Sequence, residues 1–127
     1  MAQDTCFYLI NTQPTYETRS TPDWSSLEIM HAWGGKGRVG FYYSVCKRFN
    51  LNPLAYGDVK NTTGPLEFIF ADLLRKIKSL NPDPFYDMVL IDEAQDFPQP
   101  FFEVIYLITK APKRIVWAYD EFQSLND

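Results

Sequence analysis

Apolar residues recur with a helical period in two stretches of the chain. Between Pro65 and Leu80 they show the i, i+3, i+4, i+7 spacing of one buried helix face, formed by Leu66, Ile69, Phe70, Leu73, Leu74 and Ile77. Pro65 suits the first helical position, and Asn81-Pro82 is expected to end the helix. A second amphipathic helix is predicted from Pro100 to Lys110, and Ala111-Pro112 should stop it.

Short apolar runs predict the strands. The strand from Tyr86 to Ile91 ends in four consecutive apolar residues, which is typical of a strand buried on both faces of a parallel sheet. Further strands are predicted at Phe7–Ile10, Leu27–His31 and Arg114–Tyr119, and a helix at Val39–Phe49. Strand, crossover helix and strand make a right-handed unit with parallel strands. The expected fold is therefore α/β, a parallel sheet with flanking helices, in a single domain over residues 1–127.

Composition narrows the class of protein. The chain is 46% apolar and 17% aromatic, as expected of a globular protein, and its net charge is −4. Four basic residues nevertheless fall within 13 positions that contain no acid, namely Lys36, Arg38, Lys47 and Arg48. Such a cluster could bind the phosphates of a nucleic-acid backbone, but basic clusters of this kind more often form the solvent-exposed face of a helix.

Several other classes are disfavoured. No apolar run approaches the length of a membrane span, and the first residues lack the pattern of a signal peptide, so we expect no membrane and a cytoplasmic location. Cys6 and Cys46 are too few and too separated for a disulfide framework or a cysteine metal motif. His31 is the only histidine, and no nucleophile-elbow pattern accompanies it.

Polar residues follow two of the predicted strands. Asp92-Glu93 comes directly after one, with Asp96 close behind, and Asp120 and Gln123 follow the next. Because parallel strands end at the same edge of a sheet, these residues should share the edge where α/β sheets bind ligands. One carboxylate there suits Mg²⁺, and a neighbour suits activation of a hydrolytic water. The alternative is an ordinary acidic turn, in which Asp96 caps the next helix.

These residues also resemble a known family. Asp92-Glu93-Ala94-Gln95-Asp96 resembles motif II (Walker B) of UvrD/Rep-type superfamily 1 DNA helicases, and Val116–Leu125 resembles their motif III. Ile29–Trp33 is a weaker match to motif Ib. The resemblance implies a partial RecA-like P-loop NTPase domain. Residues 27–49 would form the motif Ib region, residues 65–96 a helix and the Walker B strand, and residues 100–125 a helix and the motif III strand.

The resemblance implies a role for each matching residue. Asp92 would coordinate Mg²⁺, and Glu93 would activate the water. Gln123 would sense the γ-phosphate of ATP. Gln95 and Asp120 would belong to the nucleotide-binding network. The single-stranded DNA path would pass near His31, Trp33, Lys36 and Arg38.

The sequence departs from the family in one decisive respect, since it contains no P-loop. Gly34-Gly35-Lys36-Gly37 lacks the Ser or Thr after the lysine and is expected to be a plain loop. Tyr119 also replaces the usual Gly of motif III, and Ile29 the usual Thr of motif Ib. We therefore expect a fragment of an ATP-dependent helicase. ATP, Mg²⁺, single-stranded DNA and the remaining helicase domains would be bound by the parent protein, and neither cofactor by the isolated chain.

Two other kinds of function remain open. Aromatic residues interleaved with the basic cluster would suit a non-catalytic module that binds single strands, although aromatics at this spacing more often form core: Trp33, Phe41, Tyr42 and Tyr43. Trp117 is expected to pack in the core. A protein-interaction module is the other possibility, since a partial RecA-like domain would leave apolar helix faces and sheet edges uncovered and prone to self-association.

Overall fold

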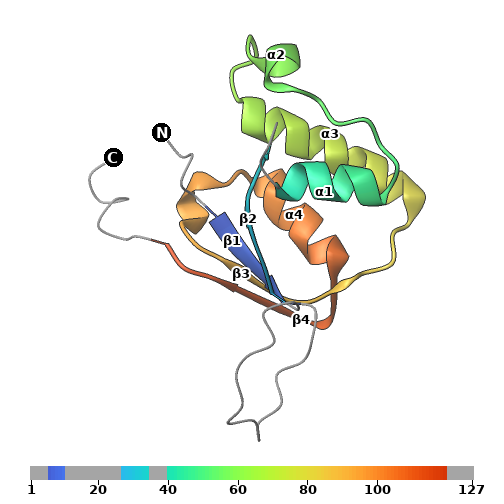
Figure 1. The fold of residues 1–127 in the computed structure, drawn as a ribbon, viewed down its shortest axis with the longest axis vertical. Coiled ribbons are helices and arrows are strands. Elements are labelled where there is room, and N and C mark those ends of the chain that lie inside the picture. The colour runs from blue at the N-terminus through green and yellow to red at the C-terminus, as the bar shows by residue number, and fades with distance from the viewer. Residues whose placement is uncertain (1–5, 11–26, 35–39, 120–127) are drawn as a thin grey trace, which may run out of the picture.

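Four strands form one sheet in the computed structural model, which describes residues 6–10, 27–34 and 40–119. The strands are β1 (Cys6–Ile10), β2 (Leu27–His31), β3 (Tyr86–Ile91) and β4 (Thr109–Trp117), in the order β2-β1-β3-β4 (Figure 1). The helical elements are α1 (Phe41–Arg48), α2 (Tyr56–Val59), α3 (Pro65–Leu80), the 3-10 turn η3 (Ala94–Asp96) and α4 (Gln99–Ile108). The fold is α/β.

The direction of the strands agrees only partly with the prediction. β3 and β4 are parallel, as expected for strands joined by a crossover helix. β1, however, is antiparallel to both β2 and β3, so the prediction of a wholly parallel sheet is wrong for this strand. Because β1 is antiparallel to both of its neighbours, β2 runs in the same direction as β3 and β4. The carboxyl ends of these three strands therefore lie along the same side of the sheet.

The helices α1, α3 and α4 lie on one side of the sheet, with α4 next to the strands and α3 packed on α4 (Figure 1). Aromatic side chains fill the space between them. Phe101 of α4 is fully buried and contacts the rings of Phe41, Phe70 and Phe97. This ring cluster joins three helices and η3 into one core.

Local signals explain where the helices begin and end. α3 has the predicted bounds, with Pro65 at its first position and Asn81 in the left-handed conformation (φ 51°) after its last turn. α4 ends at Ile108 rather than Lys110, because Thr109 is already extended and its hydroxyl donates to the Ile105 carbonyl (2.6 Å). α2 was not predicted, since one turn is too short to show a period.

The last strand lies at the edge of the sheet, which changes the role of one aromatic residue. Trp117 was expected in the core, yet 55% of it is exposed, and the ring contact the structure gives it is with Phe102 of α4. An edge strand is covered from one side only, so its side chains stay partly in solvent. Within the residues described, no helix has the length and apolar character needed to cross a membrane.

Candidate functional site

The acidic turn after β3 is tied to the neighbouring strand. The Ala94 N–H donates to the Ala118 carbonyl (2.8 Å), and the Ala118 N–H donates to the Ile91 carbonyl (2.9 Å). Asp92 and Glu93 lie between these two bonds and follow directly from the parallel pair of strands. The backbone of the turn is therefore held by β4 as well as by β3.

Within the turn, the polar groups of three predicted site residues bond to one another. The Glu93 N–H donates to Oδ1 of Asp92 (2.9 Å), and Nε2 of Gln95 donates to Oε2 of Glu93 (2.5 Å). Glu93 has left-handed backbone angles (φ 54°, ψ 50°), which are uncommon for a residue with a side chain. The turn therefore holds the carboxylates of Asp92 and Glu93 at the end of β3 at some cost in backbone strain.

Buried groups anchor the far side of the turn. Ala94 is buried, and the ring of Phe97 stacks on Phe101 with 4.1 Å between centroids. Asp96, for which capping of the next helix was the alternative to a ligand contact, is not the N-cap residue of that helix. That helix begins at Gln99 with Pro98 at its N-cap, and this N-cap makes no side-chain hydrogen bond. Pro98 and Pro100 act as turn and helix-start residues instead.

The chemistry of the turn suits a hard cation. Asp92 is exposed and Glu93 half-buried, so both carboxylates are open to solvent. Mg²⁺ commonly binds one or two carboxylates and completes its shell with water and substrate phosphates. No group of three or more His, Cys, Asp or Glu residues suited to a metal occurs in the part of the chain that the structure describes. The two carboxylates therefore fit the protein's share of a Mg²⁺–phosphate site and not a complete metal cage.

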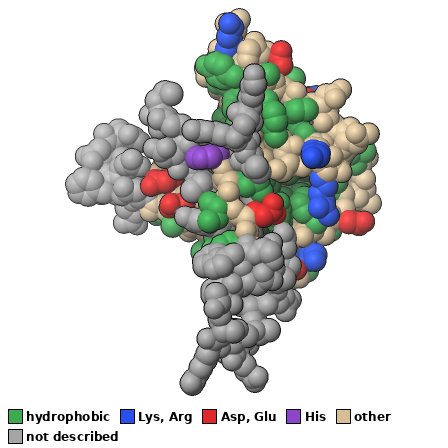
Figure 2. Space-filling model, viewed as in Figure 1, with side chains coloured by type: hydrophobic (Ala, Val, Ile, Leu, Met, Phe, Trp, Pro, Cys, Tyr) green, Lys and Arg blue, Asp and Glu red, His purple; other side chains and the backbone are tan. Residues whose placement is uncertain are grey.

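The remaining predicted site residues are placed as follows. His31 ends β2, and it is the purple side chain in Figure 2. Because Met30 and Ile91 both pair with Phe7, His31 lies at the same end of the strands as Asp92, on the other side of β1. Trp33 is half-buried and packs edge-on against Tyr42 and Tyr56. The other four lie outside the described residues, namely Lys36, Arg38, Asp120 and Gln123.

The aromatic surface imagined for single-stranded nucleic acid is largely core. Phe41 and Tyr42 are fully buried, so neither presents a ring face to solvent. The Tyr42 hydroxyl accepts a hydrogen bond from the Leu54 N–H (2.9 Å), and burial raises the pKa of this phenol well above its usual value. Arg48 lies over the ring of Phe85, 3.8 Å from its centroid, and Lys47 is exposed. This half of the basic cluster is the outer face of α1.

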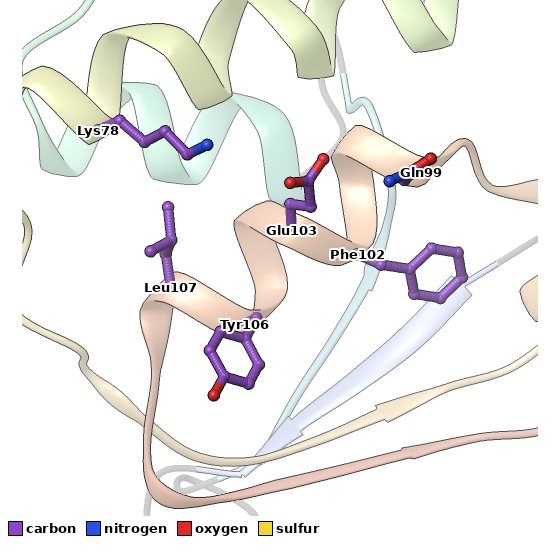
Figure 3. Close-up of a pocket in the computed structure, with 6 residues that line it drawn as sticks. All are labelled: Lys78, Gln99, Phe102, Glu103, Tyr106 and Leu107. Carbon is purple, nitrogen blue, oxygen red and sulfur yellow. The ribbon is translucent and has the colours of Figure 1, made fainter.

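Sequence reasoning missed a hollow on the outer face of α4. It has a volume of about 330 Å³ and is lined by Lys78, Gln99, Phe102, Glu103, Tyr106 and Leu107 (Figure 3). Phe102 and Tyr106 lie outside the buried face of α4. Their aromatic side chains, on the helix face expected to be polar, were the signal in the sequence that could have indicated this hollow. A second hollow, of about 490 Å³, lies beside α1 at Tyr43, Ser44 and Lys47. Neither hollow contains the acidic turn.

Comparisons of this chain with protein-family models, with curated proteins and with solved structures returned no match.

Proposed function

We propose that this chain is part of the first RecA-like domain of a UvrD/Rep-type superfamily 1 DNA helicase. The observation that carries the proposal is the pair of carboxylates at Asp92 and Glu93, at the end of a strand that is parallel to its neighbour. Charge on rigid strand ends is what phosphoryl transfer requires, since it is catalysed mainly by positioning and electrostatics. A cytoplasmic location is part of the same proposal.

In this proposal the residues divide the work between them. Asp92 holds Mg²⁺, which when bound neutralises charge on the phosphates of ATP. Glu93 takes the proton of the attacking water, and the amide of Gln95 orients its carboxylate through the hydrogen bond between them. Asp120 and Gln123 would complete the nucleotide-binding site of the parent protein. His31 and Trp33 would lie near the path of single-stranded DNA.

The first experiment measures weak metal binding by the turn. Because the isolated chain is expected to hold no metal at ordinary concentrations, Mn²⁺, which stands in for Mg²⁺ and gives an EPR signal, is titrated to millimolar concentration, and the bound fraction is determined for the wild type and for Asp92→Asn. The matched control is Asp96→Asn, an exposed carboxylate of the same turn. Loss of binding in Asp92→Asn alone supports the proposal. Equal Mn²⁺ binding by all three proteins would show that Asp92 is not a metal ligand.

The second experiment measures ATP turnover by the purified chain. We expect none, because the sequence contains no P-loop to cradle the phosphates. Turnover that disappears in Glu93→Gln would show a complete site and refute the fragment interpretation.

A non-catalytic module that binds single-stranded nucleic acid ranks second. It rests on the exposed Lys47 and the half-buried Tyr43, which border one hollow beside α1. A labelled oligonucleotide whose anisotropy stays unchanged at low salt would eliminate it.

A further inference from the structure

Tyr56, the first residue of α2, keeps most of its aromatic side chain in solvent. It is 61% exposed, and its ring meets the half-buried ring of Trp33 with 5.9 Å between centroids and 61° between the ring planes. This edge-on contact supports the tyrosine on one side only. Tyr42, which also contacts Trp33, is 1% exposed. Of the two tyrosines against Trp33, Tyr56 is therefore the one that a planar ligand can reach.

The contact between the two rings joins α2 to the end of a strand. Trp33 comes two residues after His31, the last residue of β2, and β2 runs in the same direction as β3. Trp33 therefore lies just beyond the end of the strands at which the acidic turn is found. Its contact with Tyr56 leads from there to α2, which packs against α3 (Figure 1). An elongated ligand that passes His31 and Trp33 reaches Tyr56 next.

A cation stands one helical turn further along the same face of α2. Lys60 is the C-cap residue and still has helical backbone angles (φ −60°, ψ −24°), which place it at the i+4 position from Tyr56. Side chains four residues apart in a helix are neighbours, with about 5–6 Å between their Cβ atoms. Lys60 is exposed and forms no ion pair within the described part of the chain.

The acid between these two residues is held elsewhere. Oδ2 of Asp58 accepts a hydrogen bond from the Ala55 N–H (2.8 Å), so its carboxylate lies at the start of the turn, whereas Lys60 lies at the end. Residues two positions apart in a helix do not face each other, so Asp58 also projects from another side than Tyr56. This face of α2 thus presents a ring and a cation side by side.

A ring beside a cation is the combination with which proteins hold single strands of nucleic acid. A base stacks on the ring, and the cation balances a neighbouring phosphate. Bases in a duplex already stack on one another, so a single strand is the form that offers a free base face. We propose that Tyr56 stacks on one base of single-stranded DNA and that Lys60 binds the phosphate beside it. This inference rests on the proposed function, because it extends the DNA path from His31 and Trp33 to α2.

The test measures DNA binding by the whole chain without ATP or added metal. One ring and one cation give weak binding, and the chain has a net charge of −4. A labelled oligothymidylate is therefore titrated at low salt with protein up to about 100 µM, the concentration range of weak non-specific binding. The anisotropy of the label reports the bound fraction. A wild type that leaves the anisotropy unchanged would overturn the proposal.

Three variants test the ring. Tyr56→Ala should weaken binding on the order of tenfold, the loss expected for one stacked base, whereas Tyr56→Phe keeps the ring and should bind like the wild type. Tyr106→Ala is the matched control, because Tyr106 is exposed to a similar extent (57%) on a different helix, α4, and it should leave binding unchanged. Circular dichroism confirms that each variant is folded. Equal binding by Tyr56→Ala and the wild type would overturn the proposal.

Salt dependence tests the cation. Lys60→Gln should lower the slope of log affinity against log salt concentration by about 0.7, the value for one phosphate contact on a single strand. Lys78→Gln, which changes an exposed lysine in the last turn of α3, should leave the slope unchanged. A slope that Lys60→Gln does not alter would refute the phosphate contact. Because no measurement includes ATP or metal, failure of these tests would leave the metal role of Asp92 standing, and failure of that role would leave these tests unaffected.

Discussion

The left-handed backbone of Glu93 offers a direct test of how the acidic turn is built. Its angles are φ 54° and ψ 50°, and this conformation costs a residue with a Cβ about 1–2 kcal/mol. Glycine avoids that cost but loses roughly 0.5–1 kcal/mol more backbone entropy on folding. The difference leaves Glu93→Gly about 1 kcal/mol more stable than Glu93→Ala. Both variants lose the bond to Gln95, so its contribution cancels.

The assay is urea unfolding followed by tryptophan fluorescence, with the free energies of unfolding compared at equal slope. Gln95 supplies the control, because it lies in the right-handed 3-10 turn. There the order should reverse, with Gln95→Ala more stable than Gln95→Gly by roughly 0.5–1 kcal/mol. If Glu93→Ala proved at least as stable as Glu93→Gly, the strain assigned to the turn would be wrong.

Four further predictions concern buried positions. Phe101→Ala should lower the free energy of unfolding by about 3–5 kcal/mol, because the ring is fully buried, and Tyr106→Ala on the exposed face of the same helix should cost little in the same urea titration. Gly40→Ala should lower the melting temperature strongly, because its Cβ would come within 2.1 Å of backbone atoms, and an unchanged melting curve would contradict this. Tyr42→Phe should cost about 1 kcal/mol at neutral pH by leaving the Leu54 N–H unpaired. Burial raises the pKa of Tyr42, so the unfolded phenol ionises first, and the wild type should lose stability above about pH 10 more steeply than Tyr42→Phe in unfolding curves taken at each pH.

The elements that local signals define were predictable. The bounds of α3 match because its apolar period, Pro65 and Asn81-Pro82 agree with one another within a single segment. β3 likewise follows from the run of apolar residues before Asp92. In both cases the information lies within a few residues of the element.

What could not be predicted depends on residues far away in the chain. Whether β1 runs parallel or antiparallel to β3 is decided by its pairing with both neighbours, and the apolar pattern is the same in either case. Trp117 has a core-like side chain, but its exposure follows from the place of β4 at the edge. At the candidate site, the sequence predicted that Asp92 and Glu93 lie together, but not the left-handed turn or the bonds from Ala94 and Ala118 that hold them.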